Sequence, residues 1–172
     1  MDVYDSEIQA IKRIIDVCVG IPRFTYQMQQ KDAPRPEGEY AAVKCVSSAN
    51  PGFDESKIVD VGGVEMYRSR GIRILTFQIL FSREGSEFIK CDNSFYRPDV
   101  QAVLKQEKFA AMDKKPLNLA SLVLETNWEF RQAVQMQFNV LREELSPIGV
   151  MSGAVVGGVF IDGDQVIQVE GK

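Results

Sequence analysis

Hydrophobic and polar side chains alternate from Trp128 to Arg142. The even positions carry Trp128, Phe130, Val134, Met136, Phe138 and Val140, and the odd positions carry Glu129, Arg131, Gln135, Gln137 and Asn139. A period of two residues predicts an extended strand with one buried face and one solvent-exposed face. Such a strand would be about three times the usual five or six residues. We interpret it as a platform that other elements cover, or as a strand that reaches a neighbouring molecule.

Helical spacing of hydrophobic residues indicates three helices. Ile8, Ile11, Ile15 and Cys18 predict a helix from Ser6 to Val19, which Ser6 and Gln9 would begin as a capping box and Gly20 would end. A second helix is expected from Ser86 to Phe95. A third is expected from Pro98 to Lys105, because proline is favoured at the first position of a helix.

The remaining β signals are shorter. We expect strands at Phe24–Met28, Tyr40–Ser47, Ile72–Ser82 and Phe109–Met112, and a loop or a single turn from Pro116 to Leu122. The segment from Ile72 to Ser82 has hydrophobic residues on both faces, which is typical of a central strand.

Glycine and proline divide two further stretches. Asn50-Pro51-Gly52 and Gly62-Gly63 predict a loop or a projecting β-hairpin arm over residues 48–70. Asp162-Gly163 lies between two β-prone runs and predicts a C-terminal β-hairpin extension over residues 148–172. The residues between and around these turns mix charged and β-forming side chains.

The order of these elements favours an α+β fold. Strands occur in runs with the helices grouped between them, so we expect an antiparallel or mixed β-sheet with helices packed on one face. The 172 residues suffice for one domain, residues 1–172, with the hairpin arm and the C-terminal extension attached to it. The polar face of the long strand would meet water or a partner.

Amino-acid composition excludes more classes of function than any sequence motif does. The chain contains no histidine, which removes the commonest general base and the commonest metal ligand. We find no constellation for catalysis, no cofactor-binding motif and no metal-ligand spacing, so no enzyme is predicted. The formal net charge of −4 argues against binding nucleic acid by neutralising phosphates, although DNA could pass such a surface without sticking.

Cysteine use and hydropathy fit a protein made in the cytoplasm. Cys18, Cys45 and Cys91 are an odd number of widely spaced cysteines, which we interpret as small buried side chains in a reducing compartment. No hydrophobic run approaches the ~20 residues that a membrane span needs, and the N-terminal residues do not have the pattern of a secretion signal.

Four stretches resemble the phage neck or tail terminator family. They are the N-terminal helix ending Ile-Asp-Val-Cys-Val-Gly with the strand containing Tyr26, the Ala-Pro-Arg-Pro turn at residues 33–36 leading into Tyr40, the strand from Arg70-Gly71-Ile72 to Phe81, and residues 119–138 with Leu-Ala-Ser-Leu and Thr-Asn-Trp-Glu-Phe-Arg. Their order covers the chain from residue 1 to about residue 145. The Gly- and Val-rich end, residues 148–172, departs from the family pattern.

The resemblance implies a structural virion protein of the tail or neck that is assembled in the host cytoplasm. Such proteins form a homo-oligomeric ring, typically a hexamer, that caps the tail tube, ends its polymerisation and joins the tail to the head. The partners implied are the tail tube protein and, as further neighbours, the tail sheath and the head-tail connector protein, with DNA passing through the lumen.

The residues suggest where such a ring would hold together. Closed rings need two different complementary surfaces on each subunit, and sheet edges and hairpins supply them. We therefore take the arm and the C-terminal extension as assembly elements, with contacts expected at aromatic and arginine side chains: Phe53, Tyr67, Arg68 and Phe160. Phe53 and Phe160 could instead fold back onto their own sheet, and Trp128 could be a core residue or an interface anchor.

Two other functions remain open. A head-side connector or joining ring would form a dodecamer rather than a hexamer. A small ligand-binding or enzymatic α+β domain would need a concave pocket with convergent polar groups.

Overall fold

The computed structural model describes residues 3–28, 36, 38–82, 85–117, 122–124, 127–129, 132–148, 153–160 and 163–170. For residues 116, 122–124, 127–129, 153–160 and 163–170, it describes the backbone alone. The chain divides into two units. The first contains residues 1–54 and 70–142, and the second contains residues 55–69 and 143–172.

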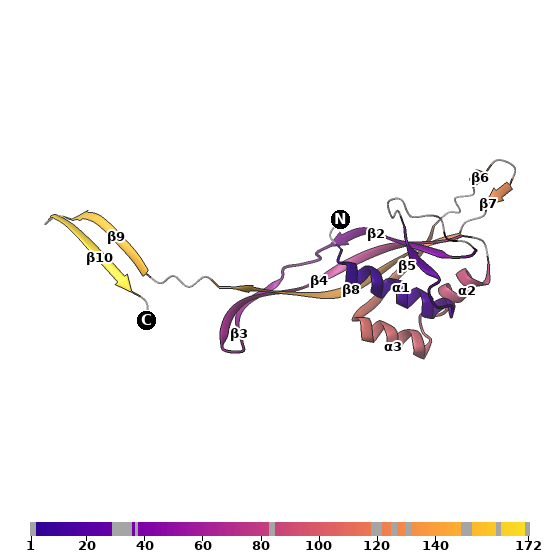
Figure 1. Ribbon diagram of the computed structural model, residues 1–172, viewed down its shortest axis with the longest axis horizontal. Helices are drawn as coiled ribbons and strands as arrows, with labels where there is room; N and C mark the ends of the chain where they lie inside the picture. The colour runs from indigo at the N-terminus through magenta and orange to yellow at the C-terminus, as the bar shows by residue number, and fades with distance from the viewer. Residues whose placement is uncertain are drawn as a thin grey trace. The chain divides into compact units, whose positions relative to one another are not determined.

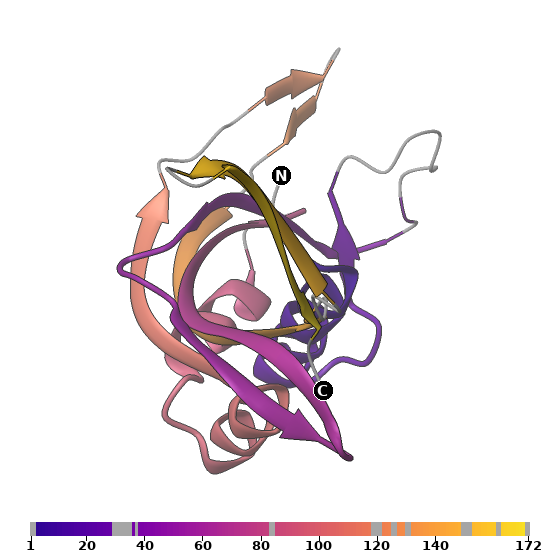
Figure 2. The same cartoon turned by 90° about the vertical axis from the view of Figure 1, so that its left-hand side faces the viewer.

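A mixed β-sheet with helices on one face forms the first unit, so the predicted α+β class is confirmed (Figure 1). Strands β1 (Thr25–Gln27), β2 (Ala41–Ala49), β4 (Val64–Phe81), β8 (Gln132–Pro147) and β5 (Phe109–Leu117) lie side by side in the order β1-β2-β4-β8-β5. β1 pairs with β2 in parallel, whereas β2 with β4 and β5 with β8 are antiparallel. Figure 2 shows β5 along one margin of the sheet.

Helices α1 (Asp5–Val19), α2 (Ser86–Asn93) and α3 (Pro98–Glu107) pack on that sheet. All three agree with the helices that the hydrophobic spacing predicts, within two residues at each end. Gly20 ends α1 in the left-handed conformation, at φ 82°. The Arg97 guanidinium donates hydrogen bonds to the carbonyls of Val17 and Cys18, which satisfies the otherwise unpaired C-terminal end of α1.

The core lies between the helices and alternating residues of the two central strands. The buried face of β8 consists of Val134, Met136, Phe138 and Val140, as the sequence pattern predicts. The buried face of β4 consists of Leu75, Phe77, Ile79 and Phe81. α1 contributes three fully buried isoleucines, Ile11, Ile14 and Ile15. Burying each such side chain stabilises the fold by about 1.5–3 kcal/mol before chain entropy is counted.

The prediction of one strand from Trp128 to Arg142 is wrong at its beginning. β7 (Asn127–Glu129) pairs with β6 (Leu122–Leu124) in a separate two-stranded sheet, and β8 starts only at Gln132. Phe130 and Arg131 lie outside the described residues, as does the side chain of Trp128. Alternation specifies extended backbone, but it does not specify that one strand continues without a break.

Two local predictions need correction. The capping box was expected at Ser6 and Gln9, but α1 begins one residue earlier, and the backbone N–H of Tyr4 donates to the Glu7 carboxylate at 2.9 Å. The loop expected from Pro116 to Leu122 is also wrong at its start, because β5 continues to Leu117. Pro116 is tolerated there because a proline on an edge strand removes no hydrogen bond from the interior of the sheet.

The two predicted hairpin segments form paired strands. β3 (Glu55–Val61) pairs with β4 across Gly62 and Gly63, and both glycines have positive φ. β4 then runs unbroken to Phe81, so it begins well before Ile72, where the sequence pattern placed its start. β9 (Gly153–Phe160) pairs antiparallel with β10 (Gly163–Glu170). That residues 48–70 project as an arm, and that residues 148–172 are an added extension, stay predictions.

The three cysteines are buried, as the sequence analysis proposes. Cys18 on α1 and Cys91 on α2 lie close enough to interact, and the Cys18 thiol together with burial raises the pKa of Cys91 well above its ordinary value. No helix in the described part of the chain is long and hydrophobic enough to cross a membrane.

A buried ion pair connects the beginning of α1 to β8. Arg142 donates to both carboxylate oxygens of Glu7, at 2.9 and 2.7 Å, and its guanidinium stacks 4.6 Å from the centre of the Tyr4 ring. Both side chains are about nine-tenths buried, at 11% and 10% exposure. The pair therefore joins two segments 135 residues apart in a place that water reaches poorly.

Replacing Arg142 with alanine tests how much this pair matters. We expect the free energy of unfolding to fall by about 3–5 kcal/mol, because the Glu7 carboxylate is left buried without its cation. Arg13→Ala is the matched control, since Arg13 forms an equally bidentate pair with Glu107 but is itself 55% exposed. The control should cost at most about 1 kcal/mol. Equal losses in urea denaturation would contradict this account.

Candidate assembly surfaces

Phe53 is the most exposed large hydrophobic side chain in the described residues. Its ring is fully accessible to solvent, so the alternative that Phe53 folds back onto its own sheet is wrong. A fully exposed phenylalanine lowers the solubility of a protein, and exposed aromatic residues are typical anchors of protein interfaces. The side chain of Phe160 lies outside the described residues, so its role stays a prediction.

The loop that carries Phe53 is held by a small polar network. The Asn50 side chain donates to the Asp54 carboxylate at 3.1 Å and accepts from the backbone N–H of Gly52 at 3.1 Å. The Arg73 guanidinium on β4 donates two hydrogen bonds to the same carboxylate, at 2.8 and 2.7 Å. The loop is therefore pre-organised, and less conformational entropy would be lost when Phe53 binds a partner.

Gly71 makes this arrangement possible. A Cβ atom at this position would lie 1.9 Å from the Asp54 carboxylate oxygen and 2.9 Å from the Arg73 guanidinium. The loop and β4 can approach this closely only because residue 71 has no side chain. The motif Arg70-Gly71-Ile72, which carries part of the family resemblance, thus coincides with the packing that positions Phe53.

Tyr67 and Arg68 lie on opposite faces of the β3–β4 hairpin, so they cannot act as one contact. Tyr67 is 44% exposed. Arg68 pairs with Glu55 at 3.0 Å and keeps only 17% of its side chain exposed, which makes it an internal brace of the hairpin. Lys57 and Arg68 together hold the pKa of Glu55 below its ordinary value, with the Lys57 hydrogen bond as the larger cause.

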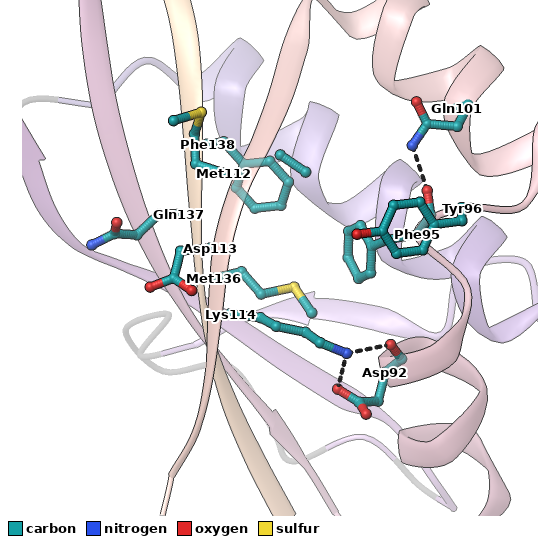
Figure 3. Close-up of a pocket in the computed structure, with 11 residues that line it drawn as sticks. Asp92, Phe95, Tyr96, Gln101, Met112, Asp113, Lys114, Met136, Gln137 and Phe138 are labelled. Atoms are coloured by element: carbon teal, nitrogen blue, oxygen red, sulfur yellow. Dashed lines mark hydrogen bonds and ion pairs between the residues drawn. The ribbon is translucent and has the colours of Figure 1, made fainter.

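A pocket opens in the first unit where the edge strand β5 meets the connection between α2 and α3 (Figure 3). Its volume is about 300 Å³. Met136 and Phe138 from β8 form part of its lining, together with Phe95 and Tyr96 from the α2–α3 connection and Ala111 from β5. Ala111 stands directly opposite Phe138 in the strand register, and its small side chain leaves space at the sheet edge.

Lys114, Asp92 and Gln101 in this pocket already bond to protein atoms. The Lys114 ammonium donates to the Asp92 carboxylate and to the Asp92 backbone carbonyl, both at 2.7 Å, and Gln101 donates to the Phe95 carbonyl (Figure 3). Among the described residues, no group of three or more aspartate, glutamate or cysteine side chains could hold a metal ion. The arrangement suits the capture of a hydrophobic side chain better than chemistry on a substrate.

Sequence reasoning missed this pocket and its most exposed member, Tyr96, which is 94% exposed. The register of β5 against β8 shifts between Ala111 and Asp113, and these residues line the pocket. The sequence carries no recognisable signal for that shift. An aromatic pair, Phe95-Tyr96, between two predicted helices was the one feature that could have drawn attention to the site.

An α+β domain with a rigidly presented aromatic residue, an edge strand and an exposed hairpin is typical of a protein that assembles with others. Comparison with protein families agrees. The family described as phage neck terminator protein matches residues 7–164, so the chain belongs to this family, as its sequence motifs suggest. The match includes residues 148–164, so the expectation that the Gly- and Val-rich end departs from the family pattern is wrong for that stretch. No curated protein matches the chain. The protein is therefore a structural component of the phage neck, located in the tail or neck region of the virion.

Substituting Gly71 with alanine tests the packing beneath Phe53. The new Cβ would push the Asp54 carboxylate away from Arg73, and we expect the free energy of unfolding to fall by about 1–3 kcal/mol. Gly52→Ala is the control in the same loop, because a Cβ there meets no atom within 4 Å. If the two variants unfold at the same denaturant concentration, the close approach does not stabilise the loop.

Proposed function

We propose that the protein forms a homo-oligomeric ring, most simply a hexamer, that caps the phage tail tube, ends its polymerisation and joins the tail to the neck. Membership of the neck terminator family supports this role. Its partners would be further copies of itself and the tail tube protein, with the tail sheath and the head-tail connector protein as additional neighbours. Assembly would take place in the host cytoplasm.

The observation that carries the proposal is the rigid presentation of Phe53. A fully exposed ring on a loop held by Asn50, Asp54 and Arg73 has no evident role in the isolated chain. Buried between subunits or against the tube, it would remove a large hydrophobic surface from water. We include Tyr67 and Phe160 as further contacts, and we assign Arg68 to bracing the hairpin that carries Tyr67.

Net charge supports passage of DNA through such a ring. The chain carries 24 acidic and 20 basic side chains, giving −4. An acidic lumen would repel the phosphate backbone, so DNA would slide instead of binding. A strongly basic bore in the assembled ring would contradict this part of the proposal.

Electron microscopy of tail tubes incubated with the purified protein tests the function. We expect six-fold density at one end of each tube and no further tube growth. Phe53→Ser should abolish the cap while leaving the free energy of unfolding within about 0.5 kcal/mol of the natural protein, because the residue is solvent-exposed. Ile21→Ala, at another exposed hydrophobic position, is the control and should cap normally.

Other outcomes would point to the alternative functions. Twelve-fold density on isolated head portals, with bare tube ends, would favour a head-side connector. A protein that ignores both structures and binds a small metabolite would favour a ligand-binding domain, with the pocket beside Tyr96 as its site. Either result would overturn the capping role.

A further inference from the structure

We propose that the β3–β4 hairpin of one copy docks on the pocket and edge strand β5 of the next copy, with Tyr67 entering the pocket beside Tyr96. This inference rests on the proposed ring and names the pair of surfaces that would close it. The hairpin arm that carries Tyr67 belongs to the second unit of the chain, and the pocket belongs to the first.

One face of the hairpin is both hydrophobic and acidic. The two-residue turn at Gly62 and Gly63 places Ile58 opposite Tyr67, and the next pair toward the turn is Asp60 and Glu65. Ile58 is 60% exposed and Tyr67 is 44% exposed, and both acidic residues are exposed as well. The face thus offers two large hydrophobic side chains beside two carboxylates, and it carries no basic side chain.

Charged residues on the other face of the hairpin bond to one another. Glu55, Lys57 and Arg68 form two ion pairs there, of 3.2 and 3.0 Å. These pairs stiffen the hairpin from one side. Val61 and Val64 lie on that side too and are exposed, but only the face with Ile58 and Tyr67 carries an aromatic side chain. A stiffened hairpin also loses less conformational entropy on docking than a mobile loop would lose.

The receiving surface has the complementary character. The pocket of about 300 Å³ is lined by Phe95, Met136 and Phe138, and it can hold one aromatic side chain. Methionine sulfur beside aromatic rings favours such an occupant. Exposed Tyr96 and Met112 extend the hydrophobic surface to the rim of the pocket (Figure 3).

Charge complementarity points to the hairpin as the occupant. α2 and β5 carry three lysines, Lys90, Lys114 and Lys115, against the two aspartates that line the pocket, Asp92 and Asp113, so one positive charge is in excess. Lys114 is engaged by Asp92, but Lys115 is 68% exposed and lies 3.7 Å from Asp113, so it can turn toward a stronger partner. Asp60 and Glu65 supply the matching negative charges, which would orient the hairpin before its hydrophobic residues are buried.

Strand geometry allows backbone pairing as well. Among the described strands, β5 ends the path β1-β2-β4-β8-β5, so its outer side offers N–H and C=O groups to another strand. β3 pairs with β4 and is a hairpin strand of similar length. Because hairpin and pocket are different surfaces of the same chain, each copy donates one and receives one, which is the heterologous contact that closes rings.

Cysteine trapping tests the contact directly. The double variant Tyr67→Cys with Tyr96→Cys is bound to tail tubes and treated with a short bismaleimide cross-linker. We expect a ladder of linked chains on a denaturing gel, rising to the full ring. The matched control is Tyr67→Cys with Tyr26→Cys, which places the second thiol at an exposed position on β1, at the opposite edge of the sheet, and should give no ladder.

The unmodified protein provides a second measurement in case the variants fold poorly. Caps assembled from equal amounts of ¹⁴N- and ¹⁵N-labelled chains are treated with a zero-length carbodiimide, and linked peptides are identified by mass spectrometry. Mixed-isotope links from Asp60 or Glu65 to Lys114 or Lys115 would support the inference. Mixed-isotope links that join other segments and omit these would overturn it.

The outcomes also distinguish failure of the hairpin contact from failure of the proposed capping function. Caps visible on tubes without the expected links would overturn the hairpin contact and leave the capping role intact. Absence of caps for the natural protein would overturn the capping role, and the inference with it.

Discussion

The structure depends on the burial of one face of β8. The helices pack on this face, which lies between the central strand β4 and the edge strand β5 and consists of Val134, Met136, Phe138 and Val140. Phe138 contacts three other aromatic rings, with centroid separations of 6.1 Å to Phe77, 6.5 Å to Phe95 and 5.5 Å to Phe109. Through these contacts one residue connects the central strand β4, the α2–α3 connection and the edge strand β5. A cavity here would loosen all three at once.

The same burial decides where the chain can offer binding surfaces. Once the even positions of β8 are covered by helices, that face of the sheet cannot meet a partner, which leaves the polar face, the sheet edges, the loops and the hairpins. The edge strand β5 carries lysines and a bulge, both of which discourage uncontrolled pairing with other strands. The proposed ring would need such protection, because its subunits must not pair with other strands before they meet the tail. Phe53 and the β3–β4 hairpin present exposed hydrophobic side chains without exposing the core.

Much of the fold could be predicted from the sequence, because the spacing of hydrophobic residues shows directly which side chains are buried. The helix from Ser6 to Val19 and the buried face of Ile72–Ser82 follow from spacing alone, and the structure confirms both. The pairing of β7 with β6 in a separate sheet and the extension of β5 through Pro116 could not be predicted, because strand pairing depends on contacts between residues far apart in sequence. For the candidate sites, the sequence left the exposure of Phe53 open, and the structure settles it. The pocket beside Tyr96 was invisible, since it arises from a strand register and from the absence of bulk at Ala111.

The central claim is that this chain works by contact with copies of itself and with the tail, through side chains held ready on its surface. A cryo-electron microscopy reconstruction of the intact phage neck, at a resolution that shows aromatic side chains, tests it most directly. The account predicts a closed ring of this protein in which the Phe53 ring is buried against another polypeptide. A ring in which every copy of Phe53 faces solvent would contradict it.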